Sequence, residues 1–167
     1  MTHPTTTDSS LFYYDGRQKV VLDLDTTQCV VDRSKIKAHL DEQRLSVICT
    51  KERKLRYELY LLPRSILTSD ELARFENLKL IEPVFAAAGG HVVVTEEIFC
   101  SKGISPAIID RANALGISPC KQSDPDLLVV ESGRALDVLA IANRLTEDFP
   151  GASFTPLWIR LMKNPRP

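Results

Sequence analysis

The chain has 167 residues, of which 44% are hydrophobic and 26% are charged, as is typical of a single globular domain with a sizeable core. Its formal net charge of -1 excludes a general attraction to nucleic acid or to an anionic membrane, although a local basic patch stays compatible with it. No apolar run is long enough to cross a bilayer, and the polar start "MTHPTTTDSS" predicts a flexible tail over residues 1–10.

The cysteines favour a cytoplasmic protein. All four are widely spaced, and no Cys-x-x-Cys pair or zinc-ligand spacing with histidine occurs. We therefore expect free, mostly buried thiols in a reducing compartment.

The first half is predicted to be rich in strands. "LFYY" and "KVVLDLD" read as two strands around an Asp15-Gly16 turn, and "DRSKIKAHLDEQ" as a short helix. "RLSVICT" and "LRYELYLLP" are predicted to be strands on either side of the charged turn "KERK". We expect residues 30–66 to form a small β-rich insertion or cap beside the main sheet.

Helices and strands alternate in the second half. Thr68 and Glu71 predict a capping box that opens a helix, which Pro83 interrupts near Glu82. "HVVVT" is then a strand, Ser105-Pro106 begins a second helix, and Gly116 ends it. After the loop "ISPCKQSDPD" follow a strand, a helix and a final strand, in "LLVV", "GRALDVLAIANRL" and "FTPLWIRL".

This alternation predicts the fold class. Short helix–strand units with continuous apolar strands are typical of a doubly wound, mainly parallel sheet with helices on both faces, a Rossmannoid α/β fold. We expect a single α/β domain over residues 11–167, with its ligands at the carboxyl ends of the strands.

Carboxylates follow three of the predicted strands. Asp23 and Asp25 end "VVLDLD", Thr95 and two glutamates end "HVVVTEE", and Glu131 ends "LLVVES". In a parallel sheet these groups would converge and require a cation such as Mg²⁺, which then binds substrate phosphates. The structural alternative is that each carboxylate favours the dipole of a following helix.

The order of these residues resembles the haloacid dehalogenase-like superfamily from Lys19 onward. Its DxDx(T/V) motif is similar to "VVLDLDTTQ", and its second motif, a strand ending in Ser or Thr, to "LIEPVFAAAGGHVVVT". The final acidic motif corresponds to "DLLVVESGRALDVLAIA", where Val130-Glu131 stands in place of the usual Gly-Asp, and Thr26 replaces a usual glycine.

The resemblance implies a Mg²⁺-dependent phosphohydrolase acting on a phosphomonoester. Asp23 would form an aspartyl-phosphate, and Asp25 would serve as general acid and then base. The remaining implied roles are metal binding by Asp23, Asp25, Glu131 and Asp137, and phosphate binding by Thr27, Thr95 and Lys121.

Two other function classes stay open. A PIN-like Mg²⁺-dependent nuclease would use Asp23, Glu97 and either Glu131 or Asp137 as ligands, with "KERKLR" and Arg134 on a phosphate backbone. A catalytically inactive module would instead bind a protein partner, with "LFYY" as an edge strand available for pairing. Cleavage of an oligonucleotide without a covalent intermediate distinguishes the nuclease, and release of phosphate from a small ester distinguishes the phosphatase.

Overall fold

The computed structural model describes residues 11–51, 53–56, 58–87 and 90–162, so the predicted tail over residues 1–10 lies outside the described residues. The strands are β1 (Phe12–Asp15), β2 (Gln18–Val21), β3 (Asp23–Asp32), β4 (Arg53–Arg56), β5 (Leu59–Pro63), β6 (Ile81–Ala87), β7 (Gly90–Cys100), β8 (Cys120–Asp124), β9 (Leu127–Val130) and β10 (Phe154–Met162). The helices are α1 (Arg33–Ile36), α2 (Glu42–Lys51), the 3-10 turn η1 (Arg64–Ile66), α3 (Ser69–Asn77), α4 (Pro106–Ala114) and α5 (Ala135–Asp148).

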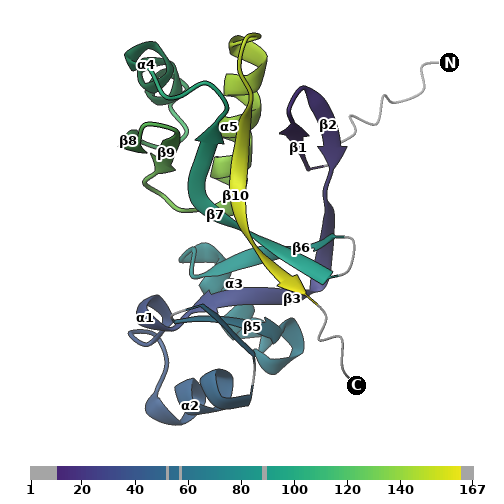
Figure 1. The fold of residues 1–167 in the computed structure, drawn as a ribbon. Coiled ribbons are helices and arrows are strands. Elements are labelled where there is room, and N and C mark those ends of the chain that lie inside the picture. Colours follow the sequence, from purple (N-terminus) through teal and green to yellow (C-terminus); the bar gives the residue numbers. More distant parts are fainter. Residues whose placement is uncertain (1–10, 52, 57, 88–89, 163–167) are drawn as a thin grey trace, which may run out of the picture.

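The main sheet is antiparallel, which corrects the prediction of a doubly wound parallel sheet. Its strands follow the order β4-β5-β3-β6-β7-β9-β8, and β10 pairs with the second edge of β7. Every pair of neighbouring strands in it runs antiparallel. β7 and β10 run side by side from the upper part of the molecule down to β3 and β6 (Figure 1).

Two consecutive units share one topology. The first unit (residues 23–87) and the second unit (residues 90–162) each run strand, helix, strand, strand, helix, strand, with the short helix α1 and the 3-10 turn η1 as additions in the first unit. The strand orders β4-β5-β3-β6 and β8-β9-β7-β10 are equivalent, with the third strand of each unit between the first two. This is the ferredoxin-like βαββαβ arrangement, and pairing of β6 with β7 joins the two copies.

The split topology explains why the fold-class prediction was wrong. β3 and β4 run parallel to each other, and so do β7 and β8. The alternation of helix and strand in the sequence implied this direction. In each case an antiparallel hairpin strand, β5 or β9, lies between the parallel pair. Short apolar strands fit either arrangement, so the sequence pattern does not tell them apart.

Residues 30–66 are part of the first unit and not a cap. β5 pairs with both β4 and β3 inside the continuous sheet. "RLSVICT" is helical in α2, because Leu45 and Ile48, three positions apart, point together into the core. The predicted strand there was wrong.

Local signals for helix ends were confirmed. Thr68 and Glu71 form the reciprocal capping box of α3, and Ser105 caps α4 with Pro106 in its first turn. Gly116, with a φ of 68°, follows the end of α4. The segment around Pro83, however, is strand β6, and "CKQSD" in the predicted loop is edge strand β8.

The helices of both units cover the same face of the sheet. Ile81 packs into the core of the first unit with Ile48, Leu62 and Phe75. Phe85, four residues along the same strand, packs into the core of the second unit, which means that both cores lie on one side. On the opposite face, Val30, Val84 and Val93 form a third, smaller cluster, against which Leu59, Leu61 and Ile159 pack.

The β1–β2 hairpin packs against the second unit, with Asp15-Gly16 as its predicted turn. Tyr13 contacts Trp158 of β10 edge-on with ring centroids 4.5 Å apart, and Asn143 of α5 donates a hydrogen bond to the Phe12 carbonyl. The "LFYY" strand is therefore engaged within the chain. Among the helices that the structure describes, none has the length and apolarity to cross a membrane.

Candidate functional site

The carboxylates that the sequence predicted at one sheet edge lie on separate elements. "VVLDLD" is divided between β2 and β3, so Asp23 begins a strand, where it is paired with Ala86 of β6. Glu131 is exposed directly after β9, and β6 and β7 separate β9 from β3. β3 and β9 also run in opposite directions. The prediction that parallel strands bring these carboxylates together at one edge of the sheet was therefore wrong.

Asp25 and Thr27 do lie together, in the part of β3 where its register with β6 shifts. The Thr27 hydroxyl and backbone N–H donate hydrogen bonds of 2.6 and 2.9 Å to one Asp25 oxygen. The other oxygen lies 2.9 Å from Nε2 of His91 in β7. The Thr27 bonds, followed by His91, hold the pKa of Asp25 below its usual value. This group stabilises the irregularity between Leu24 and Cys29 where β3 pairs with β6.

Three other predicted site residues, Lys121, Glu131 and Asp137, lie in the second unit. Lys121 is exposed on edge strand β8, and the Glu131 backbone N–H donates to the Pro119 carbonyl. Asp137 accepts a hydrogen bond of 3.0 Å from the Ser132 hydroxyl in the loop before α5. Within residues 11–162, as far as they are described, no three His, Cys, Asp or Glu side chains are grouped to hold a metal ion.

A cleft forms where β6 and β7 separate. Their ladder runs from Ala87–Gly90 to Phe85–Val92, and β9 pairs with β7 only from Glu97 onward. On the edge of β7 that faces β6 and β9, residues 93–96 therefore pair with neither strand. On the opposite edge, β10 pairs with Val93 and Val94. Strand edges without ladder partners face this opening from both sides.

A bulge in β7 shapes the cleft wall. Ile98 is paired with Pro156 and Val94 with Trp158, so Thr95, Glu96 and Glu97 lie opposite Leu157 alone. The Thr95 hydroxyl donates to the Leu157 carbonyl at 2.8 Å and accepts from the Glu97 N–H at 3.3 Å. Thr95, the predicted phosphate ligand, thus supports the bulge that carries both glutamates.

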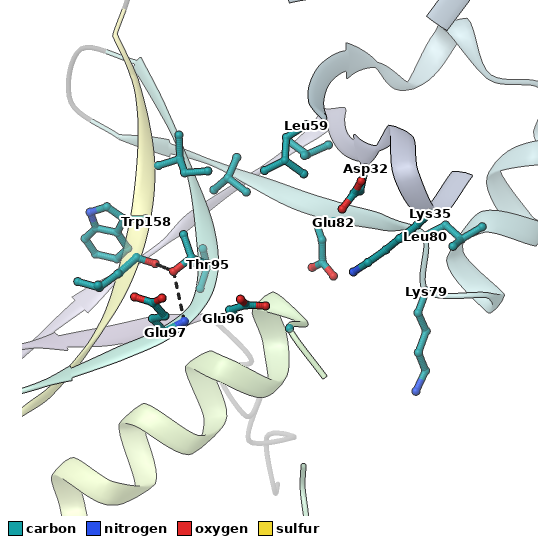
Figure 2. Close-up of a pocket in the computed structure, with 16 residues that line it drawn as sticks. Asp32, Lys35, Leu59, Lys79, Leu80, Glu82, Thr95, Glu96, Glu97 and Trp158 are labelled. Carbon is teal, nitrogen blue, oxygen red and sulfur yellow. Dashed lines mark hydrogen bonds between the residues drawn. The ribbon is translucent and has the colours of Figure 1, made fainter. Parts of the chain in front are cut away.

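The cleft has a volume of about 500 Å³. Both units and the long strands β7 and β10 contribute to its lining (Figure 2). Its apolar lining comprises Val30, Leu59, Leu80, Val93, Val94, Leu157, Trp158 and Ile159. Its charged lining comprises Asp32, Lys35, Lys79, Glu82, Glu96 and Glu97.

Glu82 is the most constrained of these charged groups. Its carboxylate accepts a 3.0 Å hydrogen bond from the Ala135 N–H and lies 3.9 Å from the Arg134 guanidinium. Burial raises the pKa of Glu82, although the Ala135 bond, Arg134 and Lys35 oppose the shift. In Figure 2 the Lys35 ammonium points toward Glu82, whereas the Lys79 side chain extends away from it.

Sequence reasoning missed most of the cleft. Glu97 was a candidate metal ligand, and both glutamates were noted after "HVVVT", but Lys35, Glu82 and the valines of β3 and β7 carried no distinguishing signal. His91 was likewise overlooked as the partner of Asp25. The available signal was the placement of "TEE" inside an otherwise apolar strand, which is unusual enough to indicate a bulge.

No known protein family, no curated protein and no solved structure matches the chain.

Proposed function

We propose that the protein is a partner-binding module that receives an extended segment of another protein in the cleft between its two units. The observation that carries this proposal is the opening between β6 and β7, where strand edges without ladder partners border an apolar floor. The third function class expected from the sequence is thus the one we favour. The binding surface is the cleft, because the "LFYY" strand contacts the second unit.

The chemistry of the cleft suits a peptide. An extended segment satisfies free strand edges with main-chain hydrogen bonds, and pockets between the strands select its side chains. Val93 and Ile159 provide apolar surface on the helix-free face. A volume of about 500 Å³ lies in the range of sites that bind small ligands or a few side chains.

Phosphoester hydrolysis, which the resemblance implies, has less support from the geometry. It requires Asp23, Asp25 and Glu131 to share one Mg²⁺, but both aspartates lie on β3 and Glu131 follows β9, and β6 and β7 separate these two strands. The nuclease alternative likewise needs Asp23, Glu97 and either Glu131 or Asp137 to lie around one ion. Geometry therefore supports binding over either hydrolysis.

Location in the cytoplasm is part of this proposal. Cys29, Cys49, Cys100 and Cys120 are free thiols, and burial raises the pKa of Cys29 and of Cys120 to about 11. Buried thiols that resist ionisation are unreactive structural groups, which agrees with a reducing compartment.

The test is a scan of fluorescein-labelled hexapeptides, varied one position at a time, against the folded protein. Fluorescence anisotropy reports binding, and Trp158, the single tryptophan of the chain, gives a second signal from the cleft rim. We expect a subset of peptides to bind the wild type and to bind Leu157→Ala about three- to tenfold more weakly, the loss expected from removing one exposed apolar contact.

Ile117→Ala is the matched control. Ile117 is exposed to 40% and Leu157 to 37%, but Ile117 lies in the loop after α4 and outside the cleft. Peptide affinity should survive this substitution. The proposal is wrong if no peptide binds, or if the two alanine variants lose affinity equally.

A further inference from the structure

We propose that the cleft selects a basic side chain, arginine or lysine, in the segment it binds. This inference rests on the proposed function and adds the charge of the ligand to it. Four carboxylates line the cleft against two lysine ammonium groups. An excess of negative charge beside apolar surface matches a side chain with a cationic end and an aliphatic stem.

Among the described side chains, the lysines leave three of the carboxylates, Asp32, Glu96 and Glu97, without a cation, and Asp32 already accepts two hydrogen bonds from Ser34. Lys35 points toward Glu82, and Lys79 extends out of the group (Figure 2). The ion pairs found among the described side chains include neither Glu96 nor Glu97. A cation brought by a ligand would therefore meet carboxylates that are not already neutralised within this part of the chain.

The bulge of β7 presents these glutamates on either side of the strand. The Thr95 hydroxyl stabilises the bulge through its hydrogen bonds to the Leu157 carbonyl and the Glu97 N–H. Glu96 and Glu97, the next two residues, therefore have fixed positions in the cleft wall. In Figure 2 the Glu96 carboxylate points toward the same side as Glu82, and Glu97 points toward β10. A planar guanidinium, with five N–H donors, has the reach to contact a carboxylate here and a strand carbonyl beside it.

Gly133 lies directly beside Glu96. A Cβ placed on Gly133 would lie 3.4 Å from Glu96 Oε2, which is already contact distance. Gly133 also has a φ of 65°, a conformation that glycine adopts without strain. The loop into α5 thus passes close to Glu96 without filling the cleft.

The apolar floor accounts for the stem of the basic side chain. Val93 and Ile159 belong to the cluster on the helix-free face, next to the glutamates of the bulge. The methylene groups of an arginine or lysine would cover these side chains while the charged end remains near Glu96, and Glu97 adds negative charge from the β10 side of the strand. An acidic residue at the same position would be repelled and would leave the floor uncovered.

The experiment compares three peptides that differ only in carrying Arg, Gln or Glu at the position that the hexapeptide scan shows to be most selective. We expect the Arg peptide to bind about tenfold more tightly than the Glu peptide at low ionic strength, and the ratio to fall as salt is added. In the double variant Glu96→Gln/Glu97→Gln the ratio should approach one. Glu42→Gln removes an exposed charge from the first turn of α2, outside the cleft. This control variant should keep the wild-type ratio of affinities for the Arg and Glu peptides.

Each outcome separates this inference from the proposed function. If Gln or Glu peptides bind as tightly as the Arg peptide, and Leu157→Ala weakens them all, the cleft binds peptides and the inference of a basic side chain is wrong. That inference is equally wrong if the double variant keeps the full Arg preference. If no peptide in the scan binds, the proposed function itself fails. Melting temperatures of the variants verify that each is folded.

Discussion

The carboxylate of Glu82 accepts a hydrogen bond from the backbone N–H of Ala135 at 3.0 Å. This bond connects β6 of the first unit with the start of α5 in the second. The residue before α5, Arg134, makes no side-chain capping bond, so Glu82 takes the role of a cap supplied from another element. The cleft wall is therefore fixed by a contact between the two units.

Stability should respond to pH through Glu82. Its folded-state pKa is raised, mainly by burial, so the stability that this group contributes is highest at low pH and falls as pH rises above the ordinary glutamate pKa of about 4.3. Glu82→Gln keeps an oxygen acceptor for Ala135 and carries no charge. We expect the variant to gain stability relative to the wild type as pH increases from about 4 to 7.

Urea denaturation of both proteins at several pH values measures this difference. Glu42→Gln, at an exposed position of α2, serves as the control for loss of a carboxylate. A free energy of unfolding of Glu82→Gln that falls relative to the wild type as pH increases would contradict the assignment of burial as the dominant effect.

Asp25 should have the opposite pH dependence. The Thr27 hydrogen bonds and His91 hold its pKa below the usual value, so its contribution is present above the ordinary aspartate pKa of about 4 and is lost as pH falls through the lowered folded-state value. Asp25→Asn should cost about 1–2 kcal/mol at pH 7, because an amide accepts these bonds more weakly. Chemical denaturation should show the deficit shrinking below about pH 4; a constant deficit would argue against a charged Asp25.

Gly133→Ala should destabilise the protein and disturb the cleft. The new Cβ would take a φ of 65° and lie 3.4 Å from Glu96 Oε2. We expect a loss of about 1–2 kcal/mol, as for an alanine forced into the left-handed region. Gly151→Ala is the matched control, because a Cβ there meets no atom within 4 Å and its φ is not in this region. Thermal melts that show equal losses for both variants would rule out this explanation.

Mg²⁺ should leave the melting temperature of the protein unchanged if its function is to bind a peptide segment and not to hydrolyse a phosphoester. Asp23 begins β3 and Glu131 follows β9, and β6 and β7 separate these strands in the sheet, so the two carboxylates are not expected to share an ion. Melting temperatures of the wild type and of Glu131→Gln should be the same with and without Mg²⁺, because a ligand stabilises only a state that binds it. An upward shift in the wild type that Glu131→Gln abolishes would restore the phosphohydrolase prediction, and release of phosphate from a generic phosphomonoester, lost in Asp23→Asn, would establish it.

The sequence by itself determined the local structure where short-range chemistry suffices. The Thr68–Glu71 capping box, the Ser105-Pro106 helix start and the Asp15-Gly16 turn all involve residues at most three positions apart. Such contacts depend on the side chains and backbone of one segment, so their sequence patterns are specific. The same holds for Asp25 and Thr27, predicted as general acid and phosphate ligand, which are hydrogen-bonded to each other because they are two residues apart.

Only the tertiary structure decided which strands became neighbours. An apolar segment such as "LLVV" buries its side chains equally well beside a parallel or an antiparallel partner, so nothing in it specifies that β9 lies between β7 and β8. The cleft depends on this order, because it forms where β7 exchanges β6 for β9 as its neighbour. Glu82 and Ala135 are 53 residues apart and meet only because the two units join at that point. Their contact arises from the packing of whole sheets, which no short segment encodes.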